Sequence, residues 1–190
     1  MPISYGIIAS QVSGHLVTDA GAMFPLGSYT VPSGGAASVT FDLTGITGYT
    51  HLQLRGILRS TASGTGSTGL LVKYNSDTGN NYTIHALEGN GTNTSAAGYA
   101  SQGYGDAIEM PKGGETASVY GGFVCDIFNY ANTNKYKTFR SLAGYDSNGS
   151  GKVGLYSSVW MSTSAITRID LTVGTGFTQY SSVALFGVKA

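Results

Sequence analysis

The chain has 190 residues, and its ten basic residues balance its ten acidic residues. A balanced charge provides neither the basic footprint of a nucleic-acid-binding protein nor a polybasic membrane patch. Charged residues make up only 11% of the chain, while Gly (29) and Tyr (13) are abundant. A typical soluble domain carries roughly 25% charged residues. A surface with so few charged residues suits short strands joined by tight turns. The composition therefore indicates a single all-β domain.

The first 27 residues have a mixed pattern, in which glycine and proline interrupt short apolar pieces. They are too apolar for an idle tail, and two interpretations stay open: an extra edge strand of the same domain, or an extended arm that docks on a partner. No basic region precedes the first apolar residues, so we expect no signal peptide. The arm interpretation predicts the following docking contacts: Ile3, Tyr5, Ile7, Ile8, Val12, Leu16, Met23 and Phe24.

Strand-like runs and glycine-rich turns alternate over residues 28–190. Val39 and Phe41 alternate with polar residues, and Leu70, Val72 and Tyr74 repeat this period of two. Further runs cover about 82–88, 117–128, 136–143, 153–160, 166–173 and 183–188. No stretch shows helical periodicity, and no apolar run approaches the ~20 residues that span a bilayer. The pattern predicts one antiparallel β-sandwich, jelly-roll-like, over residues 28–190.

Two segments resemble ligand-binding motifs without their required context. Residues 64–69 spell GxGxxG, but the residues that follow predict a strand, whereas a dinucleotide site needs a helix there. Residues 146–151 are similar to the start of a calcium loop, but Ser157 stands where a bidentate Glu is required. We expect a hairpin turn at residues 146–151, with bound calcium as the alternative. No cofactor and no metal site are predicted.

The sequence also shows no recognisable set of catalytic residues. The three histidines, His15, His51 and His85, are isolated, whereas zinc needs three or four converging ligands. Asp106 and Glu109 are only three residues apart, and no aromatic cluster surrounds them as a glycoside site would require. We therefore predict no catalytic residue and no enzymatic activity.

Most of the apolar and aromatic residues are expected to be buried. Cys125 lies in an apolar run and is expected in the core, not as a reactive thiol. Trp160 is likewise expected in the core. The tyrosines suit protein interfaces and sugar faces alike, but most are expected to fill the faces of the sheets.

Several segments in order along the chain carry a resemblance to a known family. They are residues 34–41 (GGAASVTF), 49–56 (YTHLQLRG), 74–82 (YNSDTGNNY), 130–138 (YANTNKYKT), 158–167 (SVWMSTSAIT) and 185–189 (LFGVK). With these segments the chain resembles a family of small β-sandwich structural proteins in the virions of tailed bacteriophages. Residues 1–27 lie outside the shared region.

The resemblance implies a non-enzymatic structural protein, made in the host cytoplasm and placed on the particle surface. Our first hypothesis is a capsid decoration (cement) protein that binds the major capsid protein or another virion protein as a homotrimer. The alternative is a tail-fibre or receptor-binding tip that contacts host surface carbohydrate. Neither nucleic acid nor a membrane is expected as a partner.

Overall fold

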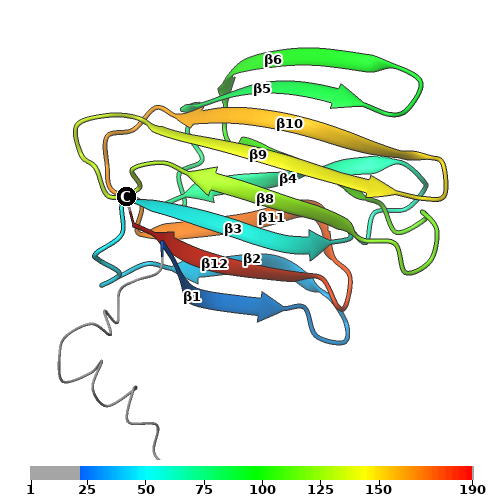
Figure 1. Ribbon diagram of the computed structural model, residues 1–190, viewed down its shortest axis with the longest axis horizontal. Coiled ribbons are helices and arrows are strands. Elements are labelled where there is room, and N and C mark those ends of the chain that lie inside the picture. Colours follow the sequence, from blue (N-terminus) through cyan, green and yellow to red (C-terminus); the bar gives the residue numbers. More distant parts are fainter. Residues whose placement is uncertain (1–21, 190) are drawn as a thin grey trace, which may run out of the picture.

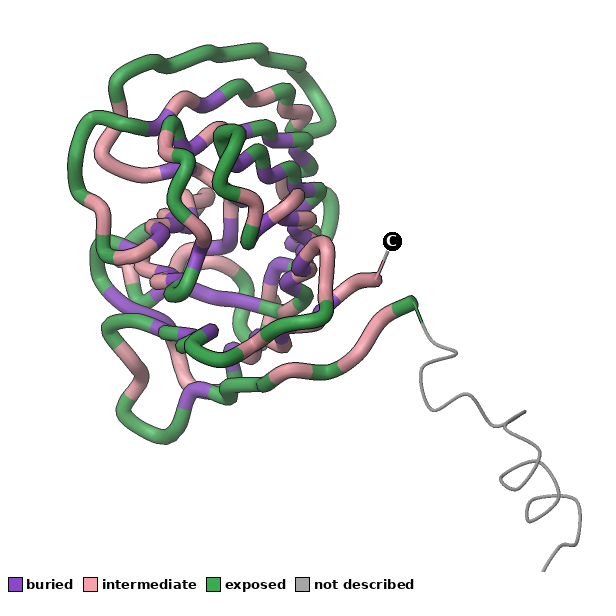
Figure 2. Tube along the Cα trace, turned by 90° about the vertical axis from the view of Figure 1, so that its left-hand side faces the viewer, coloured by how far each residue is buried: buried purple, intermediate pink, exposed green. Residues whose placement is uncertain are grey.

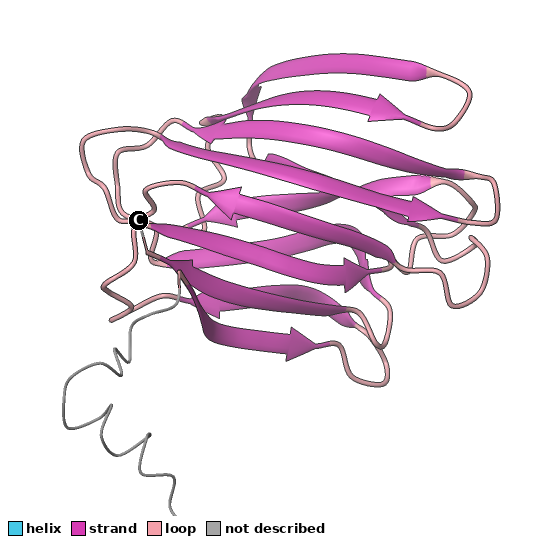
Figure 3. Ribbon diagram, in the orientation of Figure 1, coloured by secondary structure: helices cyan, strands magenta, loops and turns pink. Residues whose placement is uncertain are grey.

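A computed structural model of the protein describes residues 22–189, and it confirms the all-β prediction. Every regular element in that range is a strand (Figure 3), and the strands form two antiparallel sheets that pack as a sandwich (Figure 1). The larger sheet has the spatial order β1 (Met23–Thr30), β12 (Ser182–Val188), β3 (His51–Leu58), β8 (Gly121–Ile127), β9 (Lys137–Asp146), β10 (Gly151–Trp160), β5 (Tyr82–Gly89) and β6 (Thr94–Gln102). The smaller sheet has the order β2 (Ala36–Asp42), β11 (Arg168–Phe177), β4 (Ser67–Tyr74) and β7 (Gly105–Pro111). The jelly-roll-like topology stays a prediction.

The core lies between the two sheets, because alternate side chains of each strand point to the same face. Val39 and Phe41 of β2 are buried while their neighbours are exposed, as their period of two predicts. Leu52 and Leu54 of β3 point into the core from the larger sheet and are fully buried. Cys125 is also fully buried in this core, as the sequence predicted.

An aromatic cluster fills one part of this core. The rings of Tyr74 and Phe139 meet edge to face at a centroid distance of 5.4 Å, and Trp160 stacks on Tyr82 at 6.4 Å. The indole N–H of Trp160 donates a hydrogen bond of 2.7 Å to Asp77 Oδ2. Trp160 is 2% exposed, which confirms its predicted place in the core.

The boundary that we placed after residue 27 falls inside β1. This strand pairs with β12 at the edge of the larger sheet, with a register shift between Pro25 and Gly27. Two of the expected docking contacts, Met23 and Phe24, therefore lie in the sheet, and the Phe24 ring packs against Tyr49 at 5.7 Å. The other expected contacts lie outside the described residues: Ile3, Tyr5, Ile7, Ile8, Val12 and Leu16.

Candidate binding surface

The outer face of the larger sheet, which is turned away from the smaller sheet, carries an exposed apolar patch. Leu155 of β10 lies between Leu87 of β5 and Leu142 of β9 in one row across the sheet. Val153, two residues before Leu155 and near the start of β10, lies on the same face beside this row. Between 46 and 56% of each of these four residues is exposed. We call these four residues the outer patch.

A shallow hollow of about 320 Å³ lies on the outer patch. Val153 has Gly89 and Gly144 as its cross-strand neighbours, so no side chain flanks it there. Thr94 of β6 also lines the hollow, which places it beside the edge of the sheet. Contiguous exposed apolar surface is a common feature of sites that bind other macromolecules.

Sequence reasoning missed the outer patch, although the sequence contained a signal for it. The runs at 136–143 and 153–160 have apolar residues at both odd and even positions, such as Leu155 beside Tyr156. A strand of that kind is apolar on both of its faces. One of these faces packs in the core, and the other makes the outer patch.

The part of the same outer face formed by β3 and β8 is mixed: Val124 pairs with Leu142 and Ile57 is 47% exposed, but polar side chains lie among them. Gln53 Nε2 donates a hydrogen bond of 2.6 Å to Asp126 Oδ1, and the Arg140 guanidinium lies 5.6 Å from the centre of the Phe128 ring. His51 Nδ1 accepts a hydrogen bond from a backbone N–H, so this histidine has a structural role. The row that contains Leu142 therefore continues to Val124 and reaches a polar residue at Arg55 of β3.

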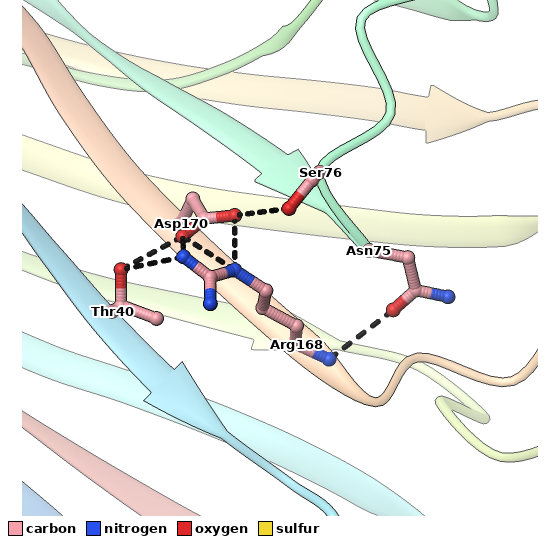
Figure 4. A network of polar contacts seen from close by, with 5 residues as sticks. All are labelled: Thr40, Asn75, Ser76, Arg168 and Asp170. Atoms are coloured by element: carbon pink, nitrogen blue, oxygen red, sulfur yellow. Dashed lines mark hydrogen bonds and ion pairs between the residues drawn. The ribbon is translucent and has the colours of Figure 1, made fainter.

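The outer face of the smaller sheet carries a network of hydrogen-bonded polar side chains (Figure 4). Asp170 of β11 accepts hydrogen bonds from Arg168 Nε and from Thr40 Oγ1 of β2, the latter at 2.7 Å. Asn75, in the turn after β4, accepts a hydrogen bond from the backbone N–H of Arg168. Because these groups satisfy one another, this face offers no apolar surface comparable to the outer patch.

A cluster of charged residues lies near the rim between the sheets. Lys152 Nζ is 3.0 Å from Glu88 Oε2 and 3.7 Å from Glu109 Oε2, and the Tyr156 hydroxyl donates a hydrogen bond to Glu88. Burial, together with the neighbouring Glu109 and Glu88, raises the pKa of Asp106 to about 7. Of the two carboxylates considered for glycoside chemistry, Glu109 is thus ion-paired with Lys152, and Asp106 lies buried beside this pair.

The two motif-like segments take ordinary turn conformations. Gly64 and Gly66 have positive φ in the loop that leads directly into strand β4. Asp146 Oδ1 accepts hydrogen bonds from the backbone N–H groups of Asn148 and Gly149, which closes the hairpin between β9 and β10. Over residues 22–189, no group of three or more His, Cys, Asp or Glu side chains is placed to hold a metal ion.

The chain was compared with protein-family models, with curated proteins and with solved structures. None of them matches. Within the described part of the chain, no helix is long and apolar enough to cross a membrane. The outer patch is therefore interpreted from its own chemistry.

Proposed function

We propose that this protein is a non-enzymatic structural protein of a phage virion, a decoration (cement) protein that binds the capsid surface. The outer patch carries the proposal, because contiguous exposed apolar area is characteristic of surfaces that bind another macromolecule. Charged residues are depleted from the cores of protein interfaces, and a chain with 11% charged residues fits that composition. The capsid protein is proposed from the resemblance of residues 28–190 to virion structural proteins.

Many copies on one particle strengthen attachment beyond the affinity of a single contact. The outer patch is small compared with a standard protein interface, so one copy alone would bind its partner weakly. Repeated copies on a lattice, or a homotrimer, multiply such contacts into avidity. This is the behaviour that a protein on a capsid lattice requires.

Replacing Leu142 with Asp is expected to weaken attachment to the particle at least tenfold. The substitution places a charge within the outer patch, where a covering partner would bury it unpaired. Leu142 is 53% exposed, so the fold should keep its stability to within about 1 kcal/mol. Co-sedimentation of the purified variant with particles that lack the protein measures the attachment.

Thr138→Asp is the matched control, because Thr138 lies on the same strand and the same face, outside the outer patch. It should attach like the natural protein. Equal attachment by the Leu142 and Thr138 variants would remove the outer patch from the binding surface.

Deleting residues 1–21 tests the docking contacts expected in the arm. The deletion leaves β1 complete, so thermal unfolding should stay close to that of the full chain. Under the arm hypothesis, the truncated chain loses attachment in the same co-sedimentation assay. Normal attachment would assign binding to the sandwich alone.

A receptor-binding tip is the second candidate, and the exposed tyrosines favour it. Tyr136 and Tyr180 are 54% and 66% exposed, and such rings can stack on sugar faces. Immunogold electron microscopy of intact particles separates the two candidates. Label spread over the head supports decoration, whereas label confined to the tail supports the receptor-binding tip.

A further inference from the structure

Strand β6 forms an open edge of the larger sheet. Among the described strands it pairs only with β5, and Figure 1 shows it at the top of the sheet, projecting past the smaller sheet. Every residue from Thr94 to Ser101 is exposed, which Figure 2 shows as a continuous exposed stretch. One side of its backbone therefore has N–H and C=O groups that no neighbouring strand satisfies.

The other three sheet edges have features that block strand pairing. Edge strand β1 contains Pro25 and a register shift, and β7 carries Asp106, Glu109 and Pro111. Edge strand β2 ends in Asp42, and its pairing with β11 is interrupted by a register shift. Proline, charges and bulges are the means by which natural proteins prevent sheets from pairing edge to edge.

Strand β6 has none of these features in its regular part. Residues 94–99 pair with β5 in continuous register, and the shift in that pairing comes only towards Ser101, whose φ is +55°. The sequence contains no charged residue from Gly89 to Gly105. An edge so free of protection is suited to accept another strand.

The absence of charge indicates which strand it accepts. Around a two-fold axis each residue lies close to its own copy, so any charge near the axis would repel itself. The residues at the middle of β6 are Ser95, Ala96, Ala97 and Gly98, which are small and neutral. They let two identical backbones approach without repulsion or steric conflict. A second copy of this chain is therefore a fitting partner.

We propose that β6 pairs antiparallel with β6 of a second copy, around a two-fold axis perpendicular to the sheet at Ala96 or Ala97. The two larger sheets then continue as one. Leu87 lies opposite Ala96 on the outer face, so with the axis at Ala96 the leucine rows of both copies align across it. The pairing places the outer patches of both copies on one continuous face and so doubles the apolar area there. The proposal does not depend on whether the protein decorates a capsid.

Sedimentation equilibrium of the full chain over a range of concentrations tests the pairing. The expected assembly contains an even number of chains: two, or six if the homotrimer forms as well. Ala97→Lys places two like charges beside the axis and should weaken the two-fold association at least tenfold. Ala37→Lys is the matched control, because Ala37 is an exposed alanine on another edge strand, β2; it should associate like the natural chain.

Hydrogen–deuterium exchange of the natural chain provides a readout that needs no substitution. Amides of residues 94–99 should exchange more slowly at high protein concentration than after dilution. A chain that stays monomeric at all concentrations would overturn the proposal. So would an assembly of any size that Ala97→Lys leaves intact, since its contacts would then lie elsewhere.

Discussion

Replacing Arg59 with Met is expected to lower the free energy of unfolding by about 3 kcal/mol. Arg59 follows β3 and is only 7% exposed, yet its guanidinium donates four hydrogen bonds to backbone carbonyls of the segment between β7 and β8. The accepting residues and distances are Thr116 at 2.7 Å, Val119 at 2.9 Å, Gly113 at 2.9 Å and Glu115 at 2.7 Å. Met fills much of the same volume but donates none of these bonds, so the segment loses its anchor.

Two measurements distinguish this anchoring from a general loss of stability. Urea unfolding gives the change in free energy, and Arg55→Met serves as the control, because Arg55 is exposed on the outer face and should change stability by less than about 0.5 kcal/mol. Trypsin under native conditions should cut after Lys112 only in the Arg59 variant. Equal cleavage of both variants would show that Arg59 does not hold this segment.

Replacing Asp106 with Asn is expected to stabilise the protein at pH 8 but not at pH 4. Burial, together with Glu109 and Glu88, raises the pKa of Asp106 from 3.8 to about 7, and its Oδ1 atom has no hydrogen-bond partner among the described residues. Since the folded chain holds this proton more tightly than the unfolded chain, stability falls as the pH rises from about 4 to 7. Asn stays neutral, so the gain reaches up to about 4 kcal/mol above pH 7.

Urea unfolding of both proteins at pH 4, 6 and 8 measures this effect. The difference between their free energies of unfolding should grow as the pH rises. The two curves should lie close together at pH 4, where Asp106 is neutral in the folded chain and only about half ionised in the unfolded chain. Asp146→Asn, at the exposed end of β9, is the control: Asn keeps the Oδ1 acceptor that closes the hairpin, so stability should change by less than about 0.5 kcal/mol at each pH. A constant difference between the Asp106 variant and the natural protein would contradict the raised pKa.

The sequence predicted those strands that have one face in the core and one in water. Alternation at Val39 and Phe41, and again at Leu70 and Val72, identified β2 and β4 with their inward residues. Strand β6 escaped prediction, because both of its faces are exposed and its sequence therefore does not alternate. The run expected at 117–128 is a strand only from Gly121, because Arg59 holds the preceding residues in a loop.

The candidate surface was harder to foresee than the fold. Leu87, Leu142 and Leu155 come from three strands, and only the sheet register shows that they are neighbours. The charged cluster depends in the same way on contacts between Lys152, Glu88 and Glu109. The turn at residues 146–151 was predicted correctly, because its hydrogen bonds join residues close together in the sequence.

The pairing of β1 with β12 decides how the fold responds to mechanical load. These two strands run antiparallel, and the backbone N–H of Lys189 donates a hydrogen bond to the carbonyl of Ala22, so both ends of the described chain leave the sheet at the same place. A force that pulls these ends apart would break the hydrogen bonds between β1 and β12 one after another. In a molecule held at these two ends, the β1–β12 pairing is thus loaded first, and the open edge at β6 lies on the opposite side of the larger sheet.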